Sequence, residues 1–200
     1  MDLIYPALIL LAYLSGSVST AVLVCRLFTL PDPRIVGSHN PGATNVLRIG
    51  GSKAALATLA GDVLKTAFPI LLADALGLSV IQLTWIGVAS LIGHCFPVYF
   101  SFKGGKGVAS MLTVVILVEP SLTALALSSW LISFWTFRRS SIASLMTALV
   151  VPIFASQYFA ELLLPLSALS AVVFIRHRVN ISNILQGIEP VIGSSKTGKN

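Results

Sequence analysis

Three short clusters hold most of the residues in this sequence that could carry out chemistry. Each combines Lys or Arg with glycines or hydrogen-bonding side chains. Glycines ahead of a helix leave backbone N–H groups free to face an anion, and the helix dipole adds partial positive charge at the same point. We therefore expect these clusters to handle an anionic group such as a phosphate. They span residues 37–48, 102–107 and 176–181.

The second cluster has the sharpest pattern. Its run KGGKG, residues 103–107, comes directly before a predicted apolar helix. A nucleotide-binding P-loop is excluded, because G-x-x-x-x-G-K-[ST] would need Gly at position 100 and Ser or Thr at position 107. The chain has Phe100 and Gly107 there. Lys106 supplies a full charge beside the glycines, although a flexible turn with lysines at a membrane surface remains an alternative.

The first and third clusters are less specific. In the first, Gly37 and Gly42 permit unusual backbone shapes, and Arg48 provides a fork-shaped cation suited to phosphate; an ordinary polar loop would have a similar composition. In the third, basic residues near a helix C-terminus can be simple capping. His177 in that cluster is interpreted as an anion-binding donor, with a general base as the alternative.

The composition indicates an integral membrane protein. The 200 residues are 56% hydrophobic and 10% charged, with mean hydropathy +0.91, whereas a soluble domain carries about 25% charged residues. The net charge of +6 would alone permit nucleic acid as a partner, but no basic helix or soluble domain could carry such a site. Cys25 and Cys95 give no sign of a disulfide.

The distribution of charge predicts seven transmembrane helices. Eleven of the 13 basic residues fall in every second connection or in the C-terminal segment, Lys53 begins a helix on the same side, and only Lys65 lies elsewhere. The opposite connections hold acidic residues and no Lys or Arg. Basic loops stay cytoplasmic, so the N-terminus is expected outside and the C-terminus inside. Glu119-Pro120 divides one long apolar stretch, because Pro favours a first helical position. The predicted helices are 3–25, 53–76, 80–100, 107–117, 120–137, 141–158 and 161–176.

Two further groups lie within the predicted helices. Asp62 and Lys65 are three residues apart and share one helix face; we interpret them as a structural pair that braces the cytoplasmic loops, with Arg48 as another possible partner of Asp62. Ser144 lies one turn into its helix and is a candidate to face the site. Histidine and cysteine spacings do not match a zinc site, and no acidic cluster suits catalytic magnesium, so no metal is expected.

Together the clusters resemble the bacterial acyl-phosphate:glycerol-3-phosphate acyltransferase family. The likeness rests on residues 37–48 (GSHNPGATNVLR), 93–110 (GHCFPVYFSFKGGKGVAS) and 177–189 (HRVNISNILQGIE). It implies a single seven-helix domain over 1–189, followed by a polar tail, 190–200, that we expect to be disordered. It also implies a bacterial inner-membrane enzyme with its site facing the cytoplasm, acyl phosphate and glycerol 3-phosphate as substrates, membrane lipid around it, and no cofactor, nucleic acid or obligate protein partner.

The resemblance also assigns residues. Lys106, His177 and Arg48 match catalytic positions. The positions that match the family's substrate contacts are Ser38, Asn45, Arg48, Gly104, Gly105, Lys106, Ser144, His177 and Asn180. The chain departs from the family pattern at His39, usually Gly, at Thr66, usually Gly, at Val179, usually Glu, and at Asn183, often Arg.

Two other classes of function remain open at this level. A transporter of phosphate esters or anions would also have basic loops, but it favours a site at the bilayer midplane and repeated halves. A non-catalytic lipid-binding relative is the second alternative, and Val179 and Asn183 are the residues that favour it.

Overall fold

The computed structural model describes residues 3–191, and every regular element in that range is helical. Residues 1–2 and 192–200 lie outside the described residues. The predicted disorder of the tail, 190–200, falls mostly on them and stays a prediction. The elements, in order, are α1 (Ile4–Gly16), α2 (Thr20–Leu27), α3 (Ala43–Ala75), α4 (Val80–Cys95), η1 (Val98–Phe100), α5 (Val108–Val118), α6 (Pro120–Phe137), α7 (Ser140–Tyr158), η2 (Ala160–Leu162), α8 (Leu163–Arg176) and α9 (Arg178–Leu185).

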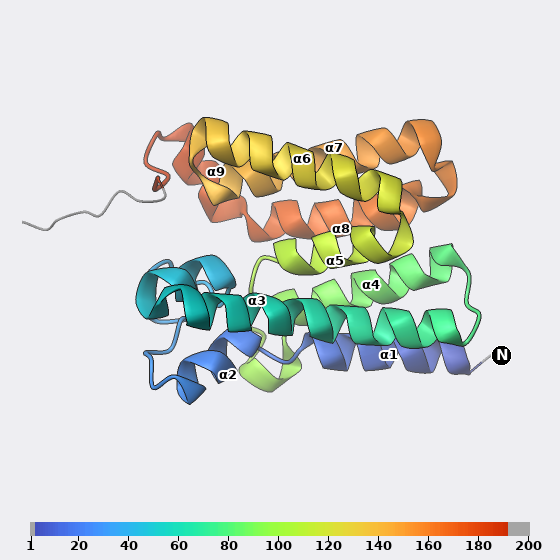
Figure 1. The fold of residues 1–200 in the computed structure, drawn as a ribbon, viewed down its shortest axis with the longest axis horizontal. Helices are drawn as coiled ribbons and strands as arrows, with labels where there is room; N and C mark the ends of the chain where they lie inside the picture. The colour runs from blue at the N-terminus through green and yellow to red at the C-terminus, as the bar shows by residue number, and fades with distance from the viewer. Residues whose placement is uncertain (1–2, 192–200) are drawn as a thin grey trace, which may run out of the picture.

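The predicted split of residues 107–137 into two helices is confirmed. Pro120 is the first residue of α6, and the Glu119 side chain caps that helix by accepting a hydrogen bond from the Ser121 N–H at 3.1 Å. Proline lacks an N–H and is therefore well suited to a first turn. The chain reverses here, so that α5 and α6 run in opposite directions (Figure 1).

Several boundaries differ from the sequence prediction, including that of α4, which ends at Cys95 and not at residue 100. The first segment is broken at residues 17–19 into α1 and α2. The next helix begins at Ala43, ten residues before the expected start, and passes through Gly51, whose φ of 75° lies outside the helical region. The second half of the first cluster is therefore helical, which corrects the expectation of a loop through residue 52. Residues 178–185 form α9, for which no helix was expected.

Helix length and composition support a membrane fold. Within residues 3–191, four stretches are long and apolar enough to cross a bilayer: Ile4–Leu27, Ala43–Ala75, Val80–Phe100 and Ser140–Tyr158. The bent pair formed by Ala160–Arg176 and Arg178–Leu185, with an angle of 61°, would be a fifth, and α5 is apolar but shorter. The all-helical prediction is confirmed for residues 3–191, whereas seven crossings and their orientation stay predictions.

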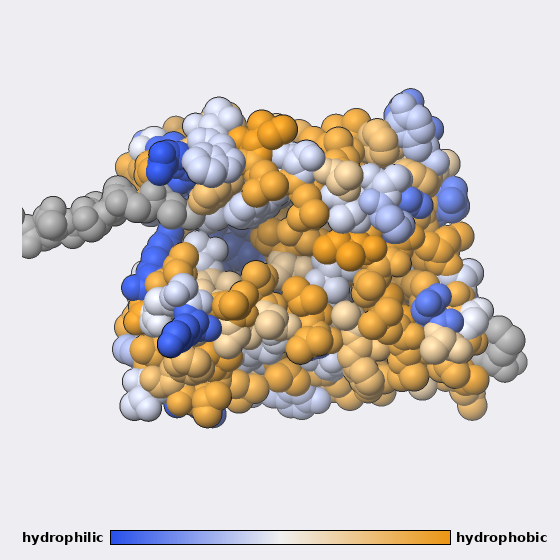
Figure 2. Space-filling view, viewed as in Figure 1, coloured by the Kyte–Doolittle hydropathy of each residue, from blue (hydrophilic) through white to orange (hydrophobic). Residues whose placement is uncertain are grey.

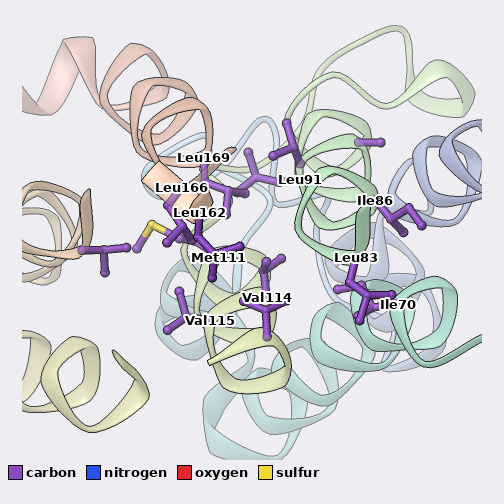
Figure 3. Packing of buried hydrophobic residues seen from close by; sticks show 14 of the residues in the cluster. Ile70, Leu83, Ile86, Leu91, Met111, Val114, Val115, Leu162, Leu166 and Leu169 are labelled. Carbon is purple, nitrogen blue, oxygen red and sulfur yellow. The ribbon is translucent and has the colours of Figure 1, made fainter. Parts of the chain in front are cut away.

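The core lies around α4 and α5. Ile86 and Leu91 of α4 are fully buried, as are Met111 and Val114 of α5 and Leu166 of α8. In Figure 3, Leu91 faces the side chains from α5 and α8, whereas Ile86 lies on the other side of α4. Many large apolar side chains also face outward, and the face drawn in Figure 2 is apolar over most of its area. A helix that is hydrophobic all round is typical of a membrane span.

Candidate active site

The loop between α2 and α3 is shaped by the buried side chain of Asn45. Its Nδ2 donates to the Pro33 carbonyl at 2.9 Å and to the Val36 carbonyl at 3.0 Å, while its Oδ1 accepts the Ser38 N–H at 2.9 Å. Gly37 has φ of 65°, and a Cβ there would meet Asn45 Oδ1 at 2.2 Å. Asn45 therefore holds the loop in this structure, and the predicted substrate contacts of Ser38 and Asn45 stay predictions.

The same loop carries an ion pair. Arg34 donates from Nη2 to Asp32 Oδ2 at 2.6 Å and from Nε to Oδ1 at 3.0 Å. Hydrogen bonds from Arg34 hold the pKa of the Asp32 carboxyl below its usual value. Arg34 is therefore committed to a local partner, whereas Arg48 projects as an exposed residue from the first turns of α3.

The glycine-rich loop of residues 103–107 runs beside the end of α4. Gly104 and Gly105 are buried. The Gly105 N–H donates to the His94 carbonyl at 3.1 Å, and Arg176 donates to the carbonyls of Gly104 and Gly105. Gly107 caps α5 with φ of 80°, a conformation that favours glycine. This loop therefore leads directly into the N-terminus of α5, as the sequence predicted.

Lys106 is half-buried in this loop among other charges. Burial lowers the pKa of its ammonium to about 8; the Glu189 carboxylate opposes the change, and the positive charges of Arg176 and Arg48 add to it. Glu189, Arg176 and Arg48 are thus all near enough to act on Lys106. The structure thus places Arg48 and Lys106, two of the three predicted catalytic residues, close enough for the charge of one to affect the pKa of the other.

His177, the third predicted catalytic residue, lies in the break between α8 and α9. Its side chain is buried, and its Nδ1 lies 2.8 Å from the Val173 carbonyl. A carbonyl can only accept, so Nδ1 carries the proton of this hydrogen bond and Nε2 is the nitrogen left for another partner.

Glu189 organises the third cluster, and it was not among the predicted site residues. Its carboxylate accepts hydrogen bonds from Ser141 Oγ at 2.5 Å, Asn180 Nδ2 at 2.7 Å and Asn183 Nδ2 at 3.3 Å. The Asn180 Oδ1 is buried without a hydrogen-bond partner among the described residues. One signal could have pointed to Glu189, because it and Asp32 are the only acidic residues in the basic connections.

The remaining predicted residue, Ser144, is buried in α7. Its Oγ donates to the Ser140 carbonyl at 2.7 Å, a common bond within a helix. The structure thus groups Lys106, His177 and Asn180 around Glu189, with Arg48 close enough to Lys106 to affect its pKa. Within residues 3–191, no hydrogen bond or ion pair joins the Ser38 or Ser144 side chain to that group.

The predicted Asp62–Lys65 pair is confirmed as a buried salt bridge of 2.8 Å. Asp62 Oδ1 also accepts from Thr20 Oγ1 at 2.6 Å and lies 3.3 Å from His94 Nδ1. Lys65 Nζ donates to the Val18 carbonyl at 2.8 Å, in the break between α1 and α2. Arg48, the other candidate partner, makes no ion pair with Asp62 in the described residues.

These contacts place the three clusters at one end of the helices, on the left in Figure 1. Figure 2 shows the surface hollowed near this end, with hydrophilic residues at the bottom of the hollow. A pocket of about 240 Å³ on this side is lined by Arg34, His39, Lys103 and Arg176, among others. Among residues 3–191, no group of three or more His, Cys, Asp and Glu side chains could hold a metal ion.

Fold and site together define an all-helical membrane protein that gathers cationic and amide groups at the ends of its helices. The sequence profile of the glycerol-3-phosphate acyltransferase family matches residues 6–187. The chain belongs to this family of integral membrane acyltransferases.

Individual relatives agree over nearly the whole chain. The glycerol-3-phosphate acyltransferase of Shewanella woodyi is 47% identical over 96% of this chain and 95% of its own length. That of Vibrio campbellii is 45% identical over 98% and 97%.

Two solved structures share the fold. Both are crystal structures of PlsY (YgiH), an integral membrane glycerol 3-phosphate acyltransferase, one in the glycerol 3-phosphate form and one in the lysophosphatidic acid form. The first superposes with a TM-score of 0.87 at 38% identity and covers 94% of this chain and 96% of its own. The second has a TM-score of 0.84 at 36% identity, with 94% and 95% covered.

Proposed function

We propose that this protein transfers a fatty acyl group from acyl phosphate to the 1-hydroxyl of sn-glycerol 3-phosphate. The products are lysophosphatidic acid and inorganic phosphate. The reaction takes place at the cytoplasmic face of the bacterial inner membrane, where the basic end of a seven-helix bundle is located. The observation that carries the proposal is the half-buried Lys106, in the glycine-rich loop ahead of α5, where the charges of Arg48 and Arg176 act on it.

Charge is the first support. Both proposed substrates carry a phosphate, and Arg48, Lys106 and the free N–H groups at the start of α5 are suited to hold such groups. Membership in a family named for glycerol 3-phosphate supports the acceptor. The two crystal structures of PlsY, 38% and 36% identical to this chain, are described as its glycerol 3-phosphate form and its lysophosphatidic acid form. The first supports the acceptor and the second supports the product.

The chemistry needs no protein nucleophile, because acyl phosphate is already activated. The 1-hydroxyl oxygen attacks the acyl carbon, the bond from that carbon to the phosphate oxygen breaks, and phosphate leaves. The hydroxyl proton passes to a phosphate oxygen of a substrate. Holding the two reactants in place can supply about 7–11 kcal/mol of the barrier, and positive groups stabilise charge on the acyl oxygen and on the departing phosphate.

The side chains have distinct parts in this proposal. Arg48 and Lys106 bind phosphate oxygens, and His177 Nε2 and the buried Asn180 Oδ1 accept hydrogen bonds from hydroxyl groups. The acyl chain lies in a lipid-facing groove between helices. A transporter would place its site near the middle of its helices, whereas these groups lie at helix ends.

The test is phosphate release by the purified protein in detergent, supplied with palmitoyl phosphate and glycerol 3-phosphate. We expect release that requires both substrates, formation of lysophosphatidic acid, and no effect of EDTA. If a well-folded preparation used palmitoyl-CoA or acyl carrier protein instead, the proposed donor would be wrong. Failure with all three donors would favour a transporter or a non-catalytic relative.

A further inference from the structure

Arg176 clamps the glycine-rich loop through two side-chain hydrogen bonds, although no sequence pattern assigned it a role there. From the last residue of α8 its Nε donates to the Gly105 carbonyl at 2.9 Å and its Nη2 to the Gly104 carbonyl at 2.8 Å. The guanidinium also lies over the Phe96 ring, 5.1 Å from its centroid. A planar guanidinium held at three points is a rigid support, which a single ammonium could not reproduce.

The two carbonyl contacts fix the direction of the neighbouring N–H groups. In a trans peptide the N–H points opposite to the C=O. Where Nη2 binds the Gly104 carbonyl, the Gly105 N–H points the other way and donates to the His94 carbonyl at 3.1 Å. Where Nε binds the Gly105 carbonyl, the Lys106 N–H is turned away from Arg176. The first of these peptides is therefore bound from both sides, and the orientation of the second depends on Arg176.

The opposite side of the loop is a close fit against His94. A Cβ on Gly104 would meet the His94 carbonyl oxygen at 2.2 Å, and one on Gly105 would meet His94 Nε2 at 2.1 Å. His94 is itself beside Asp62, with Nδ1 3.3 Å from Oδ1. The loop thus packs closely against His94 of α4, which Asp62 supports from α3, and it is clamped by Arg176 from α8.

From this geometry we propose that Arg176 is a positioning residue for the glycine-rich loop. By holding two loop carbonyls it sets the direction of the Lys106 N–H and the place of the Lys106 side chain. Because Arg176 directly precedes His177, the same contacts fix the distance between the second cluster and the third. The role assigned to the loop rests on the proposed function, whereas the clamp itself does not.

Charge alone is the competing explanation, since any cation near the site would attract phosphate. Three variants separate the two effects. Arg176→Lys keeps the charge and loses the two-pronged contact. Arg176→Gln loses both. Arg178→Gln removes the same charge two residues later, from an exposed side chain with no hydrogen bond or ion pair among residues 3–191, and is the matched control.

We expect kcat/KM with palmitoyl phosphate and glycerol 3-phosphate to fall roughly ten- to a hundredfold in both Arg176 variants, on the scale of a lost charge-assisted hydrogen bond. Part of the loss should lie in kcat, because the loop would hold its groups out of place even at saturation. Arg178→Gln should stay within about threefold of the starting protein, as expected for a partly screened surface charge. Near-normal kcat/KM in Arg176→Lys would overturn the positioning role and leave charge as the explanation.

Hydrogen exchange provides a readout that does not depend on turnover. In otherwise folded protein, the amides of residues 104–107 should exchange faster in Arg176→Lys and Arg176→Gln than in Arg178→Gln, while those in the middle of α4 stay unchanged. Equal exchange in all variants would contradict the clamp. If the starting protein used no acyl phosphate, the proposed function would fail, but the exchange comparison would still decide whether Arg176 holds the loop.

Discussion

Lys106 is a half-buried lysine whose pKa, about 8, lies near the working range of an enzyme. Burial disfavours its charged form, and Arg176 and Arg48 disfavour it further. A lysine is charged below its pKa, so Lys106 is mostly cationic at pH 7 and mostly neutral above pH 9. Binding of an anion by the free protein should therefore weaken as pH rises through about 8.

The loss of the Lys106 charge as pH rises gives a prediction for the pH profile of the enzyme. We expect kcat/KM for glycerol 3-phosphate to fall between pH 7.5 and 9.5, because that parameter reports groups of the free enzyme. A phosphate monoester loses its second proton near pH 6, so the charge of the substrate stays constant over this range. Lys106→Arg keeps its charge throughout. Its kcat/KM should be lower, but without the decline.

The contrast between the two proteins is the control for this prediction. A decline of the same size in Lys106→Arg would assign it to another group. A flat profile in the starting protein would mean that the Lys106 ammonium does not take part in binding.

At the scale of elements, the break between α1 and α2 is held by a side chain from α3. Lys65 Nζ donates to the Val18 carbonyl, and the same ammonium pairs with the buried Asp62. Because Asp62 also lies beside His94, this network joins the first helices to the surface of α4 that supports the glycine-rich loop. Loss of Lys65 would leave a buried carboxylate with fewer partners and would remove one of the two hydrogen bonds that the Val18 carbonyl accepts, the other coming from the Thr20 N–H at 3.1 Å.

We therefore expect Lys65→Met to destabilise the protein strongly. Breaking a buried ion pair by removing one partner typically costs about 3–5 kcal/mol. The matched control is Lys53→Met, since Lys53 is an exposed lysine of the same helix whose side chain makes no hydrogen bond or ion pair among residues 3–191. Thermal unfolding in detergent should show a large drop in Tm for Lys65→Met and little change for Lys53→Met. Equal shifts would contradict the bracing role.

The same network shows why local sequence patterns predicted some elements and missed others. Apolar stretches and Pro120 were enough to place α4, α5, α6, α7 and α8 within a few residues. The break at residues 17–19 depends on Lys65, 47 residues from Val18 along the chain, and no local pattern reports such a contact. A helix was predicted over 53–76, yet α3 already begins at Ala43 and continues past a kink at Gly51, whose φ of 75° favours glycine.

The candidate site shows the same division. Motif spacing pointed to Arg48, Lys106 and His177, and the structure places charged groups around Lys106 accordingly. Motif spacing could not indicate that the Asn45 amide is hydrogen-bonded within the loop. Nor could it indicate that the Glu189 carboxylate accepts hydrogen bonds from Ser141, Asn180 and Asn183. The Arg176 clamp joins residues 71 and 72 positions apart. These roles are set by tertiary contacts between distant segments.

At the scale of the whole molecule, charge and apolar surface separate along the helix axes. The basic clusters lie at the end of the molecule that carries α2 and α9, and the N-terminus lies at the other end (Figure 1). Basic segments stay in the cytoplasm, which predicts how the protein is oriented. Helix α3 links the two ends, with Lys53 near its basic end and Asp74 near the other.

Orientation can be tested with one cysteine at a time on this helix. Lys53 and Asp74 are both exposed, and at 1.5 Å per residue they are about 30 Å apart, close to the thickness of the hydrocarbon core. We expect Asp74→Cys to react with a membrane-impermeant maleimide in cells whose outer membrane has been opened, and Lys53→Cys to react only after the inner membrane is disrupted. Cys25 and Cys95 are buried, and replacing both with alanine gives the unlabelled background. The reverse pattern would place the basic end outside and would overturn the cytoplasmic site, whereas labelling of both positions in intact cells would show that α3 does not span the membrane.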